Sequence, residues 1–191
     1  MIDLLVHLDE QLFIFLNSHH WEWFDPIVDQ STKTITWVPL FAFLIYKIYK
    51  YDPKNSWWVF GGVALTILLA DQATSTFMKP YFERLRPCHD PRWDGLIHNY
   101  GRCGGLYGFA SSHAANTFGM TTFLNFKMKG KLKGFGWLYL YAFFVSYTRI
   151  YLGVHYPLDL LVGALVGVFS AWISWFLIVI VKREIIKNLL R

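Results

Sequence analysis

The sequence has 191 residues, of which 54% are hydrophobic, 19% aromatic and 16% charged, and its formal net charge is +5. An average soluble domain carries roughly 25% charged residues, so this chain has too few to cover a water-facing surface. Its apolar content excludes a disordered or collagen-like chain, and its 2 cysteines exclude a disulfide-dense secreted domain. The choice is between a large buried core and a membrane, and the apolar runs decide it.

The chain begins with an amphipathic segment. Leu4–Asn17 is apolar on one face, but it carries His7, Asp9 and Glu10, which make it a poor membrane span. We predict an interfacial amphipathic helix within an N-terminal segment of residues 1–32. Because no basic region precedes the apolar residues, we do not expect a cleaved signal peptide.

Apolar runs farther along the chain predict five membrane-spanning helices. In chain order they are Ile35–Tyr46, Trp57–Met78, Ser111–Phe126, Phe135–Leu152 and Leu160–Val181. The last run is the clearest, because its 22 uncharged residues would extend for roughly 33 Å, and the hydrocarbon core of a bilayer is about 30 Å thick. The first run is short, and the third holds several polar residues. The predicted fold is one domain, residues 1–191: an all-α integral-membrane bundle of about five transmembrane helices plus the N-terminal helix.

The basic residues are concentrated in three clusters, which follow the first, third and fifth spans. The clusters are Lys47, Lys50 and Lys54; Lys127, Lys129, Lys131 and Lys133; and Lys182, Arg183, Lys187 and Arg191. They hold 11 of the 18 Lys and Arg residues, and with five spans they fall on one side of the membrane. The positive-inside rule places that side, with the C-terminus, in the cytoplasm. The positive charge therefore indicates topology, and we expect no nucleic-acid partner.

A long polar stretch between the second and third spans, residues 79–110, is predicted to be an extracytoplasmic active-site loop. Loops of this length are uncommon in compact domains and are often functional. The stretch holds Cys88 and Cys103, and an oxidising compartment favours a disulfide between them. A metal site made by the two cysteines with His89 and His98 is the competing interpretation, although the spacing fits no zinc pattern.

Polar residues that the apolar periodicity does not explain stand at three places on the predicted outer side. These are Lys79 and Arg86 after the second span, Ser111, Ser112 and His113 at the start of the third, and Arg149, His155 and Asp159 around the start of the fifth. By the predicted topology these groups could converge, although they are far apart in the sequence. Phosphoryl transfer without a metal requires donors that bind the phosphoryl oxygens, a nucleophile, and an acid that protonates the leaving oxygen. These groups could supply all three, because they include fixed cations, hydroxyl donors, two imidazoles and a carboxylate.

In these residues the chain resembles the type 2 phosphatidic acid phosphatase superfamily, which includes membrane lipid phosphatases and the soluble vanadium haloperoxidases. The first family motif, a Lys followed after six residues by Arg-Pro, is matched in full by Lys79 and Arg86-Pro87. The second, Pro-Ser-Gly-His, is matched by Ala-Ser-Ser-His at residues 110–113, at its Ser and His only. The third, Ser-Arg, five residues, His, three residues and Asp, is matched by residues 148–159, with Thr148 in place of Ser.

The resemblance implies a role for each motif residue. His155 would be the nucleophile that forms a phosphohistidine, and Asp159, one helical turn later, would accept the other ring N–H and fix the tautomer. His113 would protonate the leaving oxygen and later deprotonate the attacking water. The phosphate oxygens would be bound by Lys79, Arg86, Ser111, Ser112 and Arg149. Because Ala110 and Ser112 depart from the family motif, we expect an altered preference for substrate shape rather than lost activity.

The leading function is an integral-membrane phosphatase that hydrolyses a lipid phosphate or diphosphate at the outer face of a bacterial inner (plasma) membrane, without metal or cofactor. The expected partners are the bilayer and a lipid that enters between helices with its tail still in the bilayer. Undecaprenyl diphosphate is the preferred substrate, with lipid A and phosphatidylglycerol phosphate as alternatives. Two other classes stay open: a vanadate-dependent peroxidase, although such enzymes are soluble, and a non-catalytic lipid-phosphate binder or transporter, although a transporter would more often show inverted repeats.

Overall fold

The structure, a computed structural model, describes residues 2–128 and 135–189, and the regular structure of these residues is helical. Its α-helices are α1 (Ile2–Asn17), α2 (Asp25–Ser31), α3 (Val38–Tyr51), α4 (Ser56–Asp71), α5 (Lys79–Phe82), α6 (Ser112–Met128), α7 (Leu138–Tyr151) and α8 (Pro157–Leu189). Short 3₁₀ turns lie at Thr34–Trp37, Pro87–His89, Pro91–Trp93 and Phe135–Trp137. Every predicted span falls on a helix, so the all-α prediction is confirmed, but the sequence did not predict α2.

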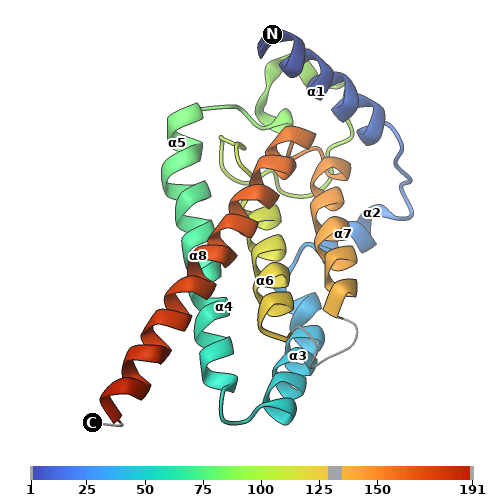
Figure 1. Cartoon of the computed structure of the whole chain (residues 1–191). Coiled ribbons are helices and arrows are strands. Elements are labelled where there is room, and N and C mark those ends of the chain that lie inside the picture. The colour runs from blue at the N-terminus through green and yellow to red at the C-terminus, as the bar shows by residue number, and fades with distance from the viewer. Residues whose placement is uncertain (1, 129–134, 190–191) are drawn as a thin grey trace.

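The centre of the bundle is α6. It packs against α4, α7 and, most extensively, α8. Its side chains from Thr117 to Leu124 are buried without interruption, which is typical of a helix surrounded by other elements. At the lower end of the bundle α3 contributes Leu44 and Ile48 to the same core as Phe123 of α6. Figure 1 shows α1 lying across the opposite end of the bundle.

Two glycines let α8 approach α6 closely. A Cβ at Gly163 would lie 2.4 Å from the carbonyl oxygen of Ser111, and a Cβ at Gly167 would lie 2.1 Å from that of Ala115. Small residues spaced four apart allow membrane helices to come this near to each other. This contact places the first turn of α8 beside the first turn of α6, where the amide of Ser111 donates to the carbonyl of Asp159 at 2.9 Å.

The second predicted span extends further than the sequence suggested. From α4 the chain continues through a π-helical segment (Gln72–Met78) into α5, so one helix covers Ser56–Phe82. Lys79 is therefore helical, and the predicted start of the loop at residue 79 is wrong by four residues. The helix ends where Glu83 takes a left-handed backbone conformation, with φ of 46°. A π-helical turn holds an extra residue and is frequent at functional sites.

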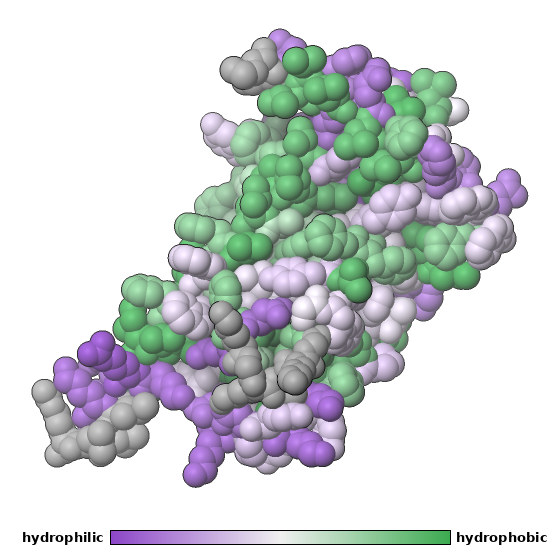
Figure 2. Space-filling view, turned by 45° about the vertical axis from the view of Figure 1, so that its right-hand side comes forward, coloured by the Kyte–Doolittle hydropathy of each residue, from purple (hydrophilic) through white to green (hydrophobic). Residues whose placement is uncertain are grey.

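The helices differ in how much of a membrane they could cross. Within the described residues, Ser56–Phe82 and Pro157–Ile185 are long and apolar enough to span one by themselves. The helices α3, α6 and α7 have only 14, 17 and 14 residues, so the predicted number of full-length spans is not exact. Large apolar side chains on α8, including Leu165, Phe169 and Trp172, point outward. Figure 2, a view turned from that of Figure 1, shows hydrophobic side chains over much of the surface between the two ends of the molecule, with strongly hydrophilic ones mainly toward those ends.

The described residues of the three basic clusters lie at the end of the bundle opposite to α1 (Figure 1). Lys47 and Lys50 belong to the last turns of α3, Lys127 to the last turn of α6, and Lys182 of α8 hydrogen-bonds to Asn55 in the turn before α4. Four members of the predicted clusters lie outside the described residues: Lys129, Lys131, Lys133 and Arg191.

The N-terminal helix α1 packs on the protein with a face that contains two polar residues and one aromatic residue. Asp9, Phe13 and Asn17, spaced four residues apart, are buried, whereas Leu5 and Leu8 are exposed. The exposed apolar face suits contact with lipid, and a position of α1 in the membrane interface stays a prediction.

Candidate active site

The predicted site residues converge at the end of the bundle that α1 covers. Lys79 lies near the C-terminal end of the long helix, His113 in the first turn of α6, and Arg149 in the last turn of α7. His155 lies two residues before α8, and Asp159 lies in its first turn. Because the neighbouring helices run in alternate directions, these ends meet on one side, as the predicted topology requires (Figure 1).

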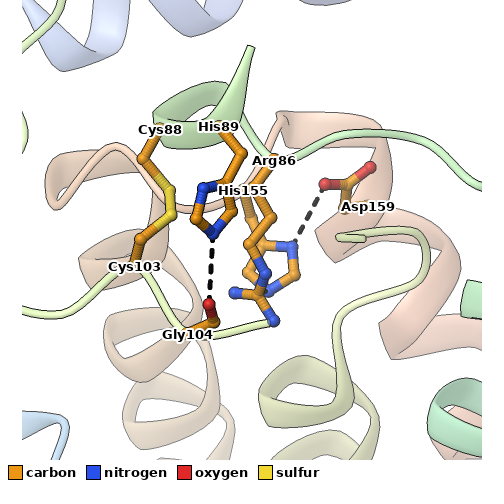
Figure 3. Close-up of a disulfide and its surroundings, with 7 residues drawn as sticks. All are labelled: Arg86, Cys88, His89, Cys103, Gly104, His155 and Asp159. Carbon is orange, nitrogen blue, oxygen red and sulfur yellow. Dashed lines mark hydrogen bonds and ion pairs between the residues drawn. A yellow bond between two sulfur atoms is a disulfide. The ribbon is translucent and has the colours of Figure 1, made fainter. Parts of the chain in front are cut away.

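His155 and Asp159 form a buried pair. The Nδ1 of His155 lies 3.1 Å from Oδ2 of Asp159, and the two residues are 1% and 0% exposed. Since a carboxylate oxygen accepts, Nδ1 carries the proton and Nε2 carries the lone pair. Nη1 of Arg86 lies 3.3 Å from Nε2, on the side of the ring away from Asp159 (Figure 3). This is the geometry that a nucleophilic imidazole needs when it attacks an anion bound by Arg86.

Burial keeps the ring of His155 neutral. It lowers the pKa of His155 from 6.5 to about 4, against the opposing effect of the hydrogen bond to Asp159. The cations Arg86 and Arg149 lower this pKa further, because they repel a protonated ring. At neutral pH the imidazole therefore retains the lone pair required for attack.

Among the residues that the structure describes, three donors near this pair are buried and lack a hydrogen-bond partner. They are Nε of Arg86, Oγ of Ser111 and Nε of Arg149. An unsatisfied buried donor is costly, and native proteins rarely keep one unless a ligand, water or ion satisfies it. All three belong to residues that the motifs predict as phosphate ligands, and together they make a site suited to the equatorial oxygens of a phosphoryl group.

Lys79 is held in place by the hydroxyl of Ser112. Its Nζ lies 2.8 Å from Oγ of Ser112 and 3.4 Å from Oγ of Ser75. Thr74 and Ser75, both in the π-helical segment, also lie within 2.9 Å of Oγ of Ser112. The serine at the position of the family's glycine is therefore the centre of a hydrogen-bond network that joins α6 to the long helix.

His113 faces a cavity beside these groups. The cavity has a volume of about 280 Å³, and polar residues in its wall include Asp71, Ser112 and Asn116. The imidazole is close enough to interact electrostatically with Lys79 and His155, as well as with both arginines. An imidazole is the side chain that most often acts as a general acid or base.

The family is decided by comparison with known proteins. The sequence model of the PAP2 superfamily matches residues 56–183, which contain all three motifs. The chain belongs to the PAP2 superfamily. The family that the sequence motifs suggested is thereby confirmed.

Two relatives of the chain are named lipid A 4'-phosphatase. The protein from Bacteroides thetaiotaomicron is 38% identical over 180 residues, which cover 93% of this chain and 80% of the relative. The protein from Porphyromonas gingivalis is 32% identical over 169 residues, which cover 87% of this chain and 71% of the relative.

Two solved structures share the fold. LpxE from Aquifex aeolicus superposes with a TM-score of 0.65 and 26% identity, over 88% of this chain and 94% of that one. A transmembrane PAP2-type phosphatidylglycerolphosphate phosphatase from Bacillus subtilis superposes with a TM-score of 0.62 and 19% identity, over 91% of this chain and 85% of that one. With the family and its relatives, the fold identifies the chain as a membrane lipid phosphatase of the PAP2 type.

The predicted disulfide is present in this PAP2 structure. It joins Cys88 and Cys103, whose Cα atoms are 6.1 Å apart (Figure 3). The competing metal interpretation does not fit, because the two sulfurs are bonded to each other and His98 pairs with Asp25 at 3.0 Å. The disulfide lies next to the site, since the amide of Cys88 donates to the carbonyl of Gly153, two residues before His155.

Sequence reasoning gave no role to Arg84, which the structure places against the His–Asp pair. Nη1 of Arg84 lies 2.8 Å from Oδ1 of Asp159, and its guanidinium lies over the ring of Tyr156 at 4.0 Å. Arg84 stands within the first PAP2 motif but at one of its unspecified positions, so the motif gave no signal for it.

Proposed function

We propose that this PAP2 phosphatase removes a phosphate group from lipid A through a phosphohistidine on His155. The similarity to two relatives named lipid A 4'-phosphatase, over most of this chain, carries the choice of substrate. Undecaprenyl diphosphate is the substrate preferred from the sequence, but the names of these relatives do not support it. They favour lipid A, the alternative.

The proposed reaction has two steps. In the first, Nε2 of His155 attacks phosphorus, the phosphorus–oxygen bond to the lipid breaks, and His113 gives its proton to the leaving alkoxide. In the second, His113 takes a proton from water, the hydroxide attacks the phosphohistidine, and inorganic phosphate leaves. Asp159 stabilises the imidazolium character that develops on His155, because its carboxylate accepts the Nδ1 proton.

Four side chains are proposed to bind the phosphoryl oxygens during both steps. Arg86, Arg149 and Ser111 supply the donors that have no protein partner in the structure. Lys79 supplies a further positive charge at the position that Ser112 fixes. Charges fixed in this way stabilise the extra negative charge of the transition state without having to reorganise.

The proposed location is a bacterial inner membrane, with the site facing the periplasm or the outside and the C-terminus in the cytoplasm. The basic residues at the end of the bundle opposite to the site support this orientation through the positive-inside rule. A single cysteine placed near residue 131 should react with impermeant thiol reagents only after the membrane is permeabilised. Reaction in intact cells would reverse the proposed orientation.

The direct test of the function is phosphate release in EDTA by detergent-purified protein. Lipid A, undecaprenyl diphosphate and phosphatidylglycerol phosphate are compared, with His155→Ala as the inactive control. We expect release from lipid A at the highest kcat/KM and no release by the variant. Faster release from either of the other lipids would refute the proposed substrate, and release by His155→Ala would refute the proposed nucleophile.

A further inference from the structure

A chain of ionic contacts joins the N-terminal helix to the proposed catalytic pair. Nη2 of Arg84 lies 2.6 Å from Oδ2 of Asp9 on α1, and Nη1 of the same guanidinium lies 2.8 Å from Oδ1 of Asp159 on α8. Asp9 is 4% exposed and Asp159 is 0% exposed. One cation therefore bridges two buried carboxylates from elements that are 150 residues apart in the chain.

Each oxygen of the Asp159 carboxylate has its own partners. Oδ1 accepts from Arg84, while Oδ2 lies 3.1 Å from both Nδ1 of His155 and the amide nitrogen of Tyr156. Rotation of the carboxylate would break both sets of contacts. The position of Arg84 therefore fixes the direction from which the carboxylate meets the imidazole.

Asp9 fixes Arg84 and the beginning of α8 together. Its Oδ1 accepts the amide N–H of Leu158, at 2.8 Å, in the first turn of α8. That amide has no partner within its own helix, so Asp9 caps α8 from another element. Arg84 is further restrained by its contact with the ring of Tyr156, whose hydroxyl accepts from the indole of Trp93 at 2.8 Å.

We propose that Arg84 is a positioning residue for Asp159 and that Asp9 holds Arg84 in place, so that α1 belongs to the phosphatase site. The inference rests on the proposed function in that it takes His155 as the nucleophile. Because the guanidinium is planar, its two hydrogen bonds fix the orientation of both carboxylates as well as attracting them. A small rotation of the imidazole away from phosphorus is expected to lower the rate far more than it lowers substrate affinity.

Asp9→Asn and Glu10→Gln form a matched pair of variants for the test. Asp9→Asn keeps an oxygen that can accept from Leu158, but it removes the charge and one acceptor for Arg84. Glu10 is the next residue of α1 and also ties this helix to the outer loop, through Arg92 at 2.7 Å, without contact to the catalytic pair. Loss of helix anchoring alone would affect both variants, whereas loss of positioning would affect only Asp9→Asn.

The readouts are kcat and KM for phosphate release, with thermal unfolding in detergent as the check on folding. We expect Asp9→Asn to lower kcat about tenfold with KM changed less than about twofold, and Glu10→Gln to keep kcat within about twofold. In the double variant of Asp9→Asn with Arg84→Gln, kcat should equal that of Arg84→Gln alone, because Asp9 acts through Arg84.

Binding of vanadate, measured by calorimetry, separates this inference from the choice of lipid. Vanadate adopts the trigonal-bipyramidal shape of the transition state, so Asp9→Asn should weaken its binding about tenfold and Glu10→Gln should not. If the wild type released no phosphate from lipid A, the proposed substrate would fail while the vanadate series still decided the positioning role. Equal effects of the two α1 variants, additive effects in the double variant, or a wild type that binds no vanadate would overturn the inference.

Discussion

The ammonium of Lys79 donates a 2.8 Å hydrogen bond to the hydroxyl of Ser112, the residue that stands where the PAP2 motif has glycine. From the sequence, this departure of Ser112 from the motif was expected to alter the preference for substrate shape. In the structure its hydroxyl instead orients a cation and connects α6 to the π-helical segment through Thr74 and Ser75. The serine that replaces the motif's glycine therefore takes part in the hydrogen bonds of the site.

Replacing Ser112 with alanine is therefore expected to lower kcat/KM by about three- to tenfold, because Lys79 loses the partner that orients it. Thr76→Ala is the matched control, since Thr76 lies in the same π-helical segment but hydrogen-bonds only to the exposed Gln72 in the described structure. Phosphate release by the two variants measures the difference. Unchanged kcat/KM in Ser112→Ala would show that the hydrogen bond has no part in activity.

Gly108 is a second position where adding a methyl group should displace His155 and Asp159. A Cβ there would lie 3.0 Å from Oδ2 of Asp159 and 3.4 Å from Nδ1 of His155, so these side chains would have to move. We expect Gly108→Ala to lower kcat about tenfold. In the same loop a Cβ at Gly105 would have no neighbour within 4 Å, so Gly105→Ala should keep wild-type activity. Equal kcat values for the two variants would contradict this view of the packing.

The disulfide should contribute to both stability and activity. It closes a loop with a sequence separation of 15 residues, for which the chain-entropy model gives about 3 kcal/mol. A Cβ added at the neighbouring Gly104 would lie 3.8 Å from Cζ of Arg86, so the loop passes close to this guanidinium and loosening the loop is expected to disturb Arg86 as well. The double variant Cys88→Ser with Cys103→Ser should unfold several degrees below the wild type and release phosphate more slowly. Two cysteines that react freely with thiol reagents in the unreduced wild type would refute the bond.

Acidification should destabilise the protein through His155. Its pKa is about 4 in the folded chain and ordinarily 6.5, so between these values the unfolded chain binds a proton that the folded chain does not. Stability from the neutral ring is therefore present above pH 6.5 and is lost as the pH falls toward 4. The melting temperature of the wild type should fall more than that of His155→Gln between pH 7 and pH 5. Parallel decreases would contradict a depressed pKa.

The sequence predicted much of the fold because its strongest signals are local. An uncharged run such as Leu160–Val181 has few alternatives to a membrane helix, and α8 covers it. The motif residues were predicted to meet because alternate spans return to the same side. The end of the long helix was misjudged, since the polar stretch is predicted to begin at Lys79, whereas the helix continues through Pro80 as far as Phe82.

The contacts of Asp9 and Arg84 could not be predicted in the same way. Asp9 is an acid in an amphipathic helix, and such a residue is usually solvated. Its burial depends on which element α1 packs against, and the sequence of α1 by itself does not say that this element is the loop that contains Arg84. In hindsight, the spacing of Asp9, Phe13 and Asn17 at intervals of four marks the face that packs on the protein.

The central claim is that His155 becomes phosphorylated during turnover. The most direct test is to quench the reaction with lipid A at high pH within one turnover and to locate phosphate by mass spectrometry. The account predicts an alkali-stable, acid-labile phosphate on the peptide that contains His155, and none in His155→Ala. Phosphate on another residue, or turnover with no phosphorylated protein at any time, would contradict it.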